Sequence, residues 1–110
     1  MDISYKDKKL EKYANDNRLA VKKLGQRMAK VFNFRLNNLR NCETLKDAEN
    51  LPGAYHELVG NRKGQWACDL EFPYKLVFEP QEDPIPTNEN GQYLWIEIKG
   101  IEIIEIVDYH

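Results

Sequence analysis

The sequence has few cysteines: only Cys42 and Cys68, which lie 26 positions apart with no CxxC motif and no neighbouring Cys/His pair. A structural zinc site or a disulfide framework is therefore not expected. No apolar run approaches the ~18 residues that a membrane-spanning helix needs, so we expect no membrane partner. The first six residues contain no apolar segment, and we expect no secretory signal. Together these absences favour a reduced, cytoplasmic protein.

The motifs of several common enzyme classes are also missing. The sequence contains no phosphate-binding glycine loop, no GxGxxG, no HExxH and no GxSxG. We therefore expect no cofactor and no metal. With 110 residues, 42% of them hydrophobic and 31% charged, the chain has the size and composition of one soluble domain, residues 1–110.

Positive and negative residues are nearly equal in number but are unevenly distributed along the sequence. The formal net charge is −2, yet residues 1–42 carry 11 Lys+Arg against 4 Asp+Glu, a net +7, and residues 43–110 carry −9. Such asymmetry suggests a polyanionic partner. A lysine-rich, solvated helix face would produce the same pattern, and on charge alone the two explanations remain open.

The hydrophobic pattern of the first half is helical. It predicts a short strand at residues 3–5, a small helix over 7–15, and one long helix from Arg18 to about Cys42 that Gly25 weakens without ending. Asp16 and Asn17 separate the two helices. A last short turn begins after Thr44 and stops before residue 52.

The pattern of the second half is alternating. We predict strands at 65–72 and 74–78, a loop insertion at 80–91 rich in proline and acidic residues, and strand-forming runs at 93–98 and 101–107. On the first strand one face should carry Trp66, Cys68, Leu70 and Phe72. Helices followed by neighbouring strands predict an α+β fold, with antiparallel pairing and the helices on one face.

The residue types available for chemistry fit metal-free RNA cleavage. Such a reaction needs a base for the 2′-OH, an acid for the leaving 5′-oxygen and cations for the phosphorane; histidine, arginine and lysine serve these purposes. Tyr109 can stack on an unpaired base. The simpler alternatives are that His56 is a solvated loop residue, that Tyr109 is an aromatic at the core edge, and that His110 is only a terminal residue.

Three segments resemble HigB-type toxins of the RelE/ParE superfamily. Residues 56–66, HELVGNRKGQW, look like the family's His-x-Leu-Lys-Gly-Asp-Arg-x-Gly-x-Trp segment. Residues 74–78, YKLVF, resemble its arginine-centred strand, and the closing residues 106–110, IVDYH, are similar to its Asp-Tyr-His end. The resemblance covers about 55–110, with 80–91 as an insertion.

The resemblance implies a curved antiparallel sheet with two N-terminal helices packed on one face. It implies ribosome-dependent cleavage of mRNA in the decoding site, a neutralising helix-turn-helix antitoxin, and promoter DNA bound only through the toxin–antitoxin complex. Carried over by position, the catalytic group comprises His56, Lys75, Asp108, Tyr109 and His110.

Further contacts with RNA follow as hypotheses. Arg62 and Lys63 are candidate phosphate ligands, and Lys22, Lys23 and Arg27 would face ribosomal RNA or the antitoxin.

Three positions depart from the family pattern. Val59 stands where a lysine is common, Asn61 replaces an aspartate, and Lys75 lacks the bidentate fork of the usual arginine. Two other functions therefore stay open. The chain could be a toxin of the same fold that inhibits DNA gyrase without catalysis, or an interaction module that has lost its activity.

Overall fold

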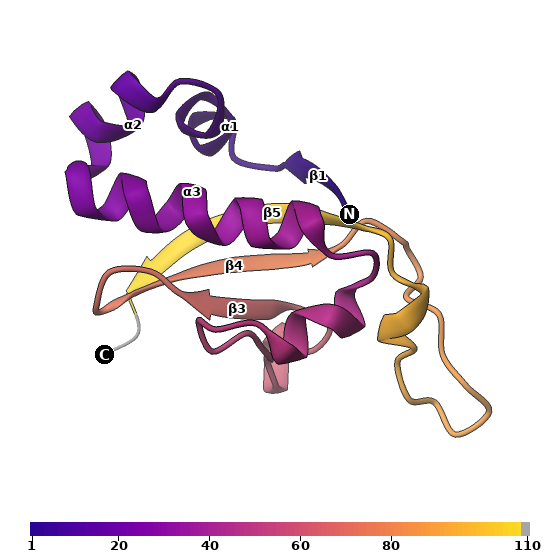
Figure 1. Cartoon of the computed structure of the whole chain (residues 1–110). Coiled ribbons are helices and arrows are strands. Elements are labelled where there is room, and N and C mark those ends of the chain that lie inside the picture. Colours follow the sequence, from indigo (N-terminus) through magenta and orange to yellow (C-terminus); the bar gives the residue numbers. More distant parts are fainter. Residues whose placement is uncertain (109–110) are drawn as a thin grey trace.

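A computed structural model describes residues 1–108, which form one layer of helices packed on one sheet (Figure 1). The chain begins with strand β1 (Asp2–Tyr5), followed by helices α1 (Lys8–Asn15), α2 (Asn17–Leu24) and α3 (Gln26–Asn41) and the 3-10 helix η1 (Leu45–Asn50). The remaining elements are β2 (His56–Glu57), η2 (Gly60–Arg62), β3 (Trp66–Asp69), β4 (Tyr74–Pro80), η3 (Trp95–Glu97) and β5 (Gly100–Asp108).

The sheet has the strand order β1-β5-β4-β3-β2. The three pairs among β2, β3, β4 and β5 are antiparallel, as the run of adjacent strands predicts, but β1 pairs with β5 in parallel. This parallel pair follows from the chain path, because α1, α2, α3 and the later strands all lie between β1 and β5 in sequence. The α+β class is confirmed, with a mixed sheet in place of a purely antiparallel one.

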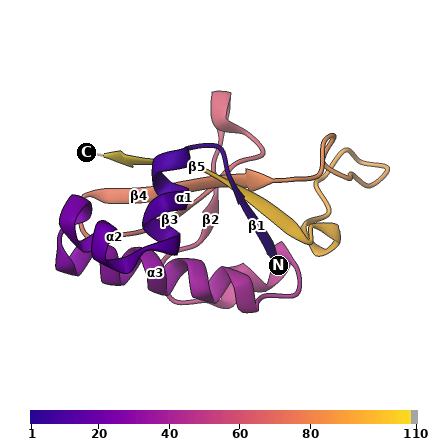
Figure 2. The ribbon, with the colours of Figure 1, turned by 90° about the horizontal axis from the view of Figure 1, so that it is seen from above.

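The helical layer contains three helices, so the prediction of one unbroken helix from residue 18 to about residue 42 is wrong. Gly25 has φ 88° and ψ 159°, a conformation that is almost restricted to glycine, and the chain turns there between α2 and α3 (Figure 2). The expected boundary before α2 is confirmed: the Asp16 carboxylate accepts a hydrogen bond from the Leu19 amide at 3.2 Å.

The core lies between α3 and one face of the sheet. Phe32, Leu36 and Leu39 of α3 are fully buried against Trp66 and Phe78 in one hydrophobic cluster. The two aromatic rings stack with centroids 6.4 Å apart. The strand register then identifies the residues on the other face of the sheet, because side chains alternate along a strand. His56, Ala67 and Val77 lie in line across β2, β3 and β4, and therefore share the face that α3 does not cover.

Two sequence predictions fail near strand ends. Phe72, expected on the buried face, is 87% exposed because β3 ends at Asp69 and residues 70–73 form a turn. The predicted strand at 93–98 is largely the 3-10 helix η3, which places Trp95 and Ile98 in the core and leaves Ile96 exposed.

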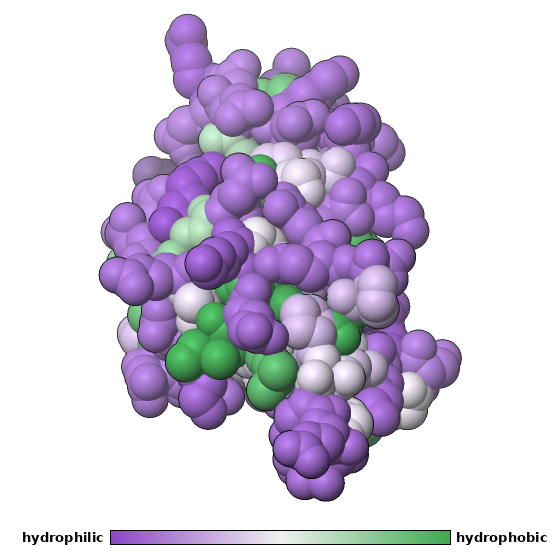
Figure 3. Space-filling model, turned by 90° about the vertical axis from the view of Figure 1, so that its right-hand side faces the viewer, coloured by the Kyte–Doolittle hydropathy of each residue, from purple (hydrophilic) through white to green (hydrophobic). Residues whose placement is uncertain are grey.

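The rest of the architecture concerns the surface. Figure 3 shows a mainly hydrophilic side of the molecule with small, separate apolar areas. Within residues 1–108, no helix is both long and apolar enough to cross a bilayer.

Candidate active site

His56 begins the short edge strand β2 and has an exposed side chain. Its Nδ1 lies 2.6 Å from the carbonyl oxygen of Ala54. A carbonyl only accepts, so Nδ1 carries the proton in this contact. In the neutral ring Nε2 is then the unprotonated nitrogen, available as a base. Local backbone geometry thus selects which nitrogen can take up a proton.

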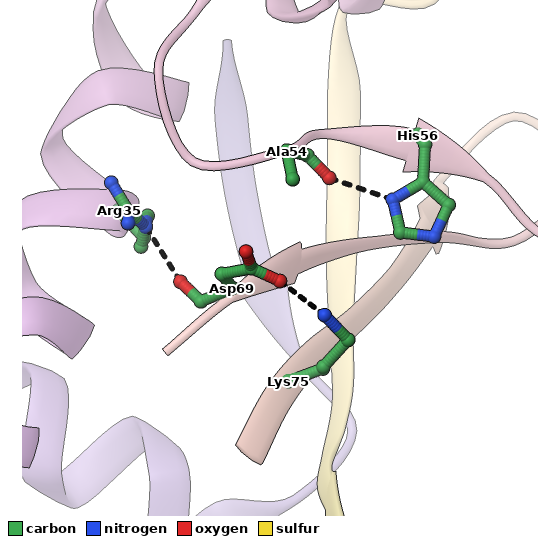
Figure 4. A network of polar contacts seen from close by, with 5 residues as sticks. All are labelled: Arg35, Ala54, His56, Asp69 and Lys75. Carbon is green, nitrogen blue, oxygen red and sulfur yellow. Dashed lines mark hydrogen bonds and ion pairs between the residues drawn. The ribbon is translucent and has the colours of Figure 1, made fainter. Parts of the chain in front are cut away.

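Lys75 forms an ion pair with a carboxylate on the neighbouring strand. Its Nζ donates to Oδ1 of Asp69, and the two residues face each other in the β3–β4 register (Figure 4). The side chains remain 29% and 42% exposed. Since surface ion pairs of this kind contribute only about 0–1 kcal/mol, a phosphate can replace the carboxylate at small cost.

Arg62, at the end of η2, lies across the same face of the sheet. One nitrogen, Nη1, donates to Gln65 Oε1 at 2.8 Å, and Nη2 donates to Glu105 Oε2 at 3.3 Å. Glu105 is opposite Val77, whose face also carries His56. The guanidinium is therefore held over the helix-free face by one amide and one carboxylate.

These three side chains share one hollow, of about 410 Å³. The lining consists of His56, Leu58, Val59, Asn61, Arg62 and Lys75. The hollow thus combines an imidazole with two cations that come from β2, η2 and β4. That combination suits proton transfer beside a charged phosphate. Val59, at a position where the HigB-type segment that residues 56–66 resemble often has a lysine, is 84% exposed and supplies no charge to the rim.

Lys63 is not among the residues that line the hollow. Its Nζ lies 5.6 Å from the centre of the Tyr93 ring, at a distance typical of a cation–π contact. A Cβ atom built on Gly64 would lie 3.1 Å from Ile85 Cδ1, so the 80–91 loop packs directly against this segment. The loop therefore supports the backbone that follows Arg62, a connection that the sequence alone did not indicate.

The C-terminal strand β5 ends beside β4, the strand that carries Lys75. In the β4–β5 register Val107 faces Lys75 and the exposed Asp108 faces Tyr74. By strand alternation, Asp108 occupies a position on the opposite face from Lys75. Tyr109 and His110, the other predicted members of the catalytic group, lie outside the described residues.

The basic residues of the helical layer lie away from this hollow. Lys22 and Lys23 are in the last turn of α2 and Arg27 is in the first turn of α3, all three exposed. These helices cover the opposite face of the sheet from His56. Any RNA contact by these residues would therefore form on a second surface, separate from the hollow.

The sequence interpretation missed the carboxylates of the site. Asp69 and Glu105 hold Lys75 and Arg62, but their strands were assigned only from apolar residues. Strand alternation could have placed both carboxylates on the face of the hollow. Asp69 is two positions after Ala67, and Glu105 is two positions before Val107, which pairs with Lys75. Within residues 1–108 no group of three His, Cys, Asp or Glu side chains is arranged to hold a metal ion.

Buried titratable groups lie on the core side of the site. Burial raises the pKa of the Cys68 thiol from 9.0 to about 12. Burial also raises the pKa of Tyr55, whose hydroxyl donates to the Arg35 carbonyl oxygen at 3.1 Å. Both groups are therefore neutral at physiological pH and do not serve as nucleophiles there.

The fold is that of RelE/ParE toxins: a first strand and three helices, followed by the other four strands of a five-stranded, mostly antiparallel sheet. A solved structure that shares it is described as a YoeB/ParE toxin from Agrobacterium tumefaciens, which aligns with a TM-score of 0.60 over 100% of both chains. Its sequence identity is 13%, so this likeness concerns the fold. No family model and no curated protein sequence matches the chain.

Proposed function

We propose that this chain is the toxin of a type II toxin–antitoxin pair and that it cleaves mRNA in the decoding site of the ribosome. One observation carries the proposal: His56, Arg62 and Lys75, from three separate elements, line a single solvent-facing hollow on the helix-free face of the sheet. The RelE/ParE toxin fold and the resemblance of residues 56–66 to HigB-type toxins support it independently.

The proposed reaction requires no metal. Nε2 of His56 takes the proton of a 2′-OH, and the 2′-oxygen attacks phosphorus. The bond from phosphorus to the 5′-oxygen breaks, which leaves a 2′,3′-cyclic phosphate on one fragment and a 5′-OH on the other. Lys75 and Arg62 offset the charge that develops on the phosphorane oxygens. By resemblance, His110 donates the proton that the leaving 5′-oxygen takes up, Asp108 orients or tunes His110, and Tyr109 stacks on a base.

Binding of RNA would exchange partners at both cations. Lys75 leaves Asp69, and Arg62 leaves Glu105, as the phosphate enters the hollow. An ionised phosphate forms short, charge-assisted hydrogen bonds with both cations. The ribosome would supply the remaining order by holding the message, which explains how so few groups suffice.

The partners follow from the same proposal. We expect a cognate helix-turn-helix antitoxin, and contact with promoter DNA only through the toxin–antitoxin complex. The setting would be the cytoplasm, where ribosomes and messages meet. The exposed Lys22, Lys23 and Arg27 would contact ribosomal RNA or the antitoxin on the helical surface.

The test is cleavage of a defined message on purified 70S ribosomes. Primer extension should locate cuts in the translated message only when ribosomes are present. End-group analysis should identify cyclic phosphate or 3′-phosphate on the upstream fragment. An intact message at saturating toxin would overturn the proposal.

One observation favours a non-catalytic alternative. Both strong cations of the hollow have carboxylate partners, which lowers the positive potential that RNA would meet. A toxin of this fold that inhibits DNA gyrase would need no free phosphate site. Inhibition of gyrase supercoiling without cleavage of ribosome-bound message would select this function. Growth arrest on induced expression separates both toxins from an inactive interaction module.

A further inference from the structure

We infer that Arg35, on the helical side of the sheet, is a positioning residue that sets the geometry of both His56 and Lys75. The inference rests on the proposed function, because it concerns the same site. Arg35 touches neither the hollow nor any group that would react. Its side chain instead binds main-chain atoms of the two segments that hold the imidazole and the ammonium. Figure 4 shows the contact with Asp69.

The guanidinium joins two segments that are distant in sequence. Nε donates to the Asp69 carbonyl oxygen at 2.6 Å, and Nη1 donates to the Pro52 carbonyl oxygen at 3.3 Å. The Asp69 amide in turn donates to the Gly53 carbonyl oxygen at 2.8 Å. One planar cation therefore fixes the end of β3 against the turn that precedes His56. Arginine suits this task because its donors are held in a rigid fork.

The turn before His56 needs such support. Ala54 has φ 55°, a left-handed conformation that a residue with a side chain rarely adopts, because its Cβ then crowds the following carbonyl oxygen. The Ala54 carbonyl oxygen accepts the Nδ1 proton of His56. If the turn relaxes, this hydrogen bond is lost and Nδ1–H is no longer favoured over Nε2–H.

Gly53 shows how closely the turn packs on the guanidinium. A Cβ atom at this position would lie 2.7 Å from Arg35 Cζ, closer than atoms in contact allow, and the backbone φ of 121° itself favours glycine. The Tyr55 hydroxyl adds a further bond to the Arg35 carbonyl oxygen. Residues 52–55 are therefore fixed to α3 through both the side chain and the main-chain carbonyl of Arg35.

The second arm reaches Lys75. Arg35 fixes the main chain of Asp69, and the Asp69 carboxylate holds the Lys75 ammonium. Without Arg35 the end of β3 keeps the bond from the Asp69 amide to Gly53 and its pairing with β4, but Lys75 loses part of the support for its starting position beside the hollow. Small displacements of this kind reduce rates by about 10- to 100-fold while folding is retained.

The experiment compares Arg35→Lys and Arg35→Ala with the wild-type chain. Nitrogen-15 NMR of the histidine rings, assigned with His56→Gln, should show Nδ1–H for His56 in the wild type. Nε2–H should increase in both variants, because the single ammonium of lysine lacks the separate Nε and Nη1 donors that Arg35 directs at the two carbonyl oxygens. On ribosomes we expect kcat to fall about 10- to 100-fold in Arg35→Ala, less in Arg35→Lys, with KM for the ribosome unchanged.

Arg40→Ala is the matched control, because Arg40 is on the same helix and its side chain donates to Asn37 and Tyr5, away from residues 52–56 and 69. It should leave the His56 tautomer and kcat unchanged. A wild-type tautomer in both Arg35 variants would overturn the inference, whether or not the chain cleaves RNA. If Arg35→Ala does not fold, Arg35→Lys decides by the same criterion. If the wild-type chain does not cleave RNA but the Arg35 variants still show the tautomer shift, the proposed function is refuted and the positioning role stands.

Discussion

At the scale of single residues, Lys75 and Arg62, the two cations that line the hollow, each face a carboxylate. Lys75 pairs with Asp69 and Arg62 with Glu105. These carboxylates keep long, flexible side chains close to where a phosphate would bind, and they also compete with that phosphate. The first prediction concerns the balance between these effects at Lys75.

Replacing Lys75 with arginine tests whether geometry or charge limits the site. Lys75→Arg introduces the bidentate fork found at this position in the HigB-type strand that residues 74–78 resemble, and we expect equal or faster cleavage of ribosome-bound message. Lys75→Ala should reduce kcat about 100-fold, since a charge that stabilises the transition state is lost. Single-turnover cleavage measures both. Equal rates for Lys75→Ala and wild type would remove Lys75 from the reaction.

The buried thiol gives a prediction about pH. Burial raises the pKa of Cys68 from 9.0 to about 12, so the unfolded chain loses this proton at lower pH than the native chain does. The resulting stabilisation is complete below pH 9 and is lost as the pH rises from about 9 to about 12. Urea unfolding across this range should show a shallower decline for Cys68→Ala than for wild type. An equal decline of the free energy of unfolding in both chains would show that the Cys68 thiol does not contribute to its pH dependence.

At the scale of elements, the turn at Gly25 decides the shape of the helical layer. The φ of 88° and ψ of 159° belong to a region that costs other residues about 1–3 kcal/mol. We expect Gly25→Ala to lower the free energy of unfolding by that amount in urea titrations. Gln26→Ala, at the neighbouring exposed position, should change it by less than about 0.5 kcal/mol. A more stable, more helical Gly25→Ala chain would mean that α2 and α3 can merge.

The same elements show what the sequence can and cannot predict. The strands around Trp66 and Phe78 were predictable because alternation and β-propensity agree there. The break at Gly25 was not, because an isolated glycine within a helical pattern is compatible with continuation as well as with a turn. Residues 93–98 have strand propensity, yet burial of Trp95 and Ile98 selects a 3-10 turn.

The residues of the candidate site were predictable in part. The resemblance supplied His56, Arg62 and Lys75, which the fold brings to one hollow. Arg35 gave no local signal, since its contact with the Asp69 carbonyl oxygen joins residues 34 positions apart in sequence. Only the packing of α3 against β3 brings them together.

At the scale of the whole molecule, the charges lie on two surfaces. The helical surface carries Lys22, Lys23 and Arg27, and the sheet surface carries the hollow. Reversing all three helical charges to glutamate should weaken binding to ribosomes and flatten its dependence on salt, because fewer phosphate contacts release fewer counterions. Sedimentation with 70S ribosomes at several salt concentrations measures the slope. An unchanged slope would assign this surface to another partner or to solvation.

The central claim is that the hollow around His56 is where RNA is cut. Its most direct test is single-turnover cleavage of a defined message on 70S ribosomes by the wild-type chain, by His56→Gln and by Lys46→Ala, an exposed change on η1. The account predicts that His56→Gln binds ribosomes normally but cleaves at least about 100-fold more slowly, while Lys46→Ala matches the wild type. Cleavage by His56→Gln at the wild-type rate would contradict it.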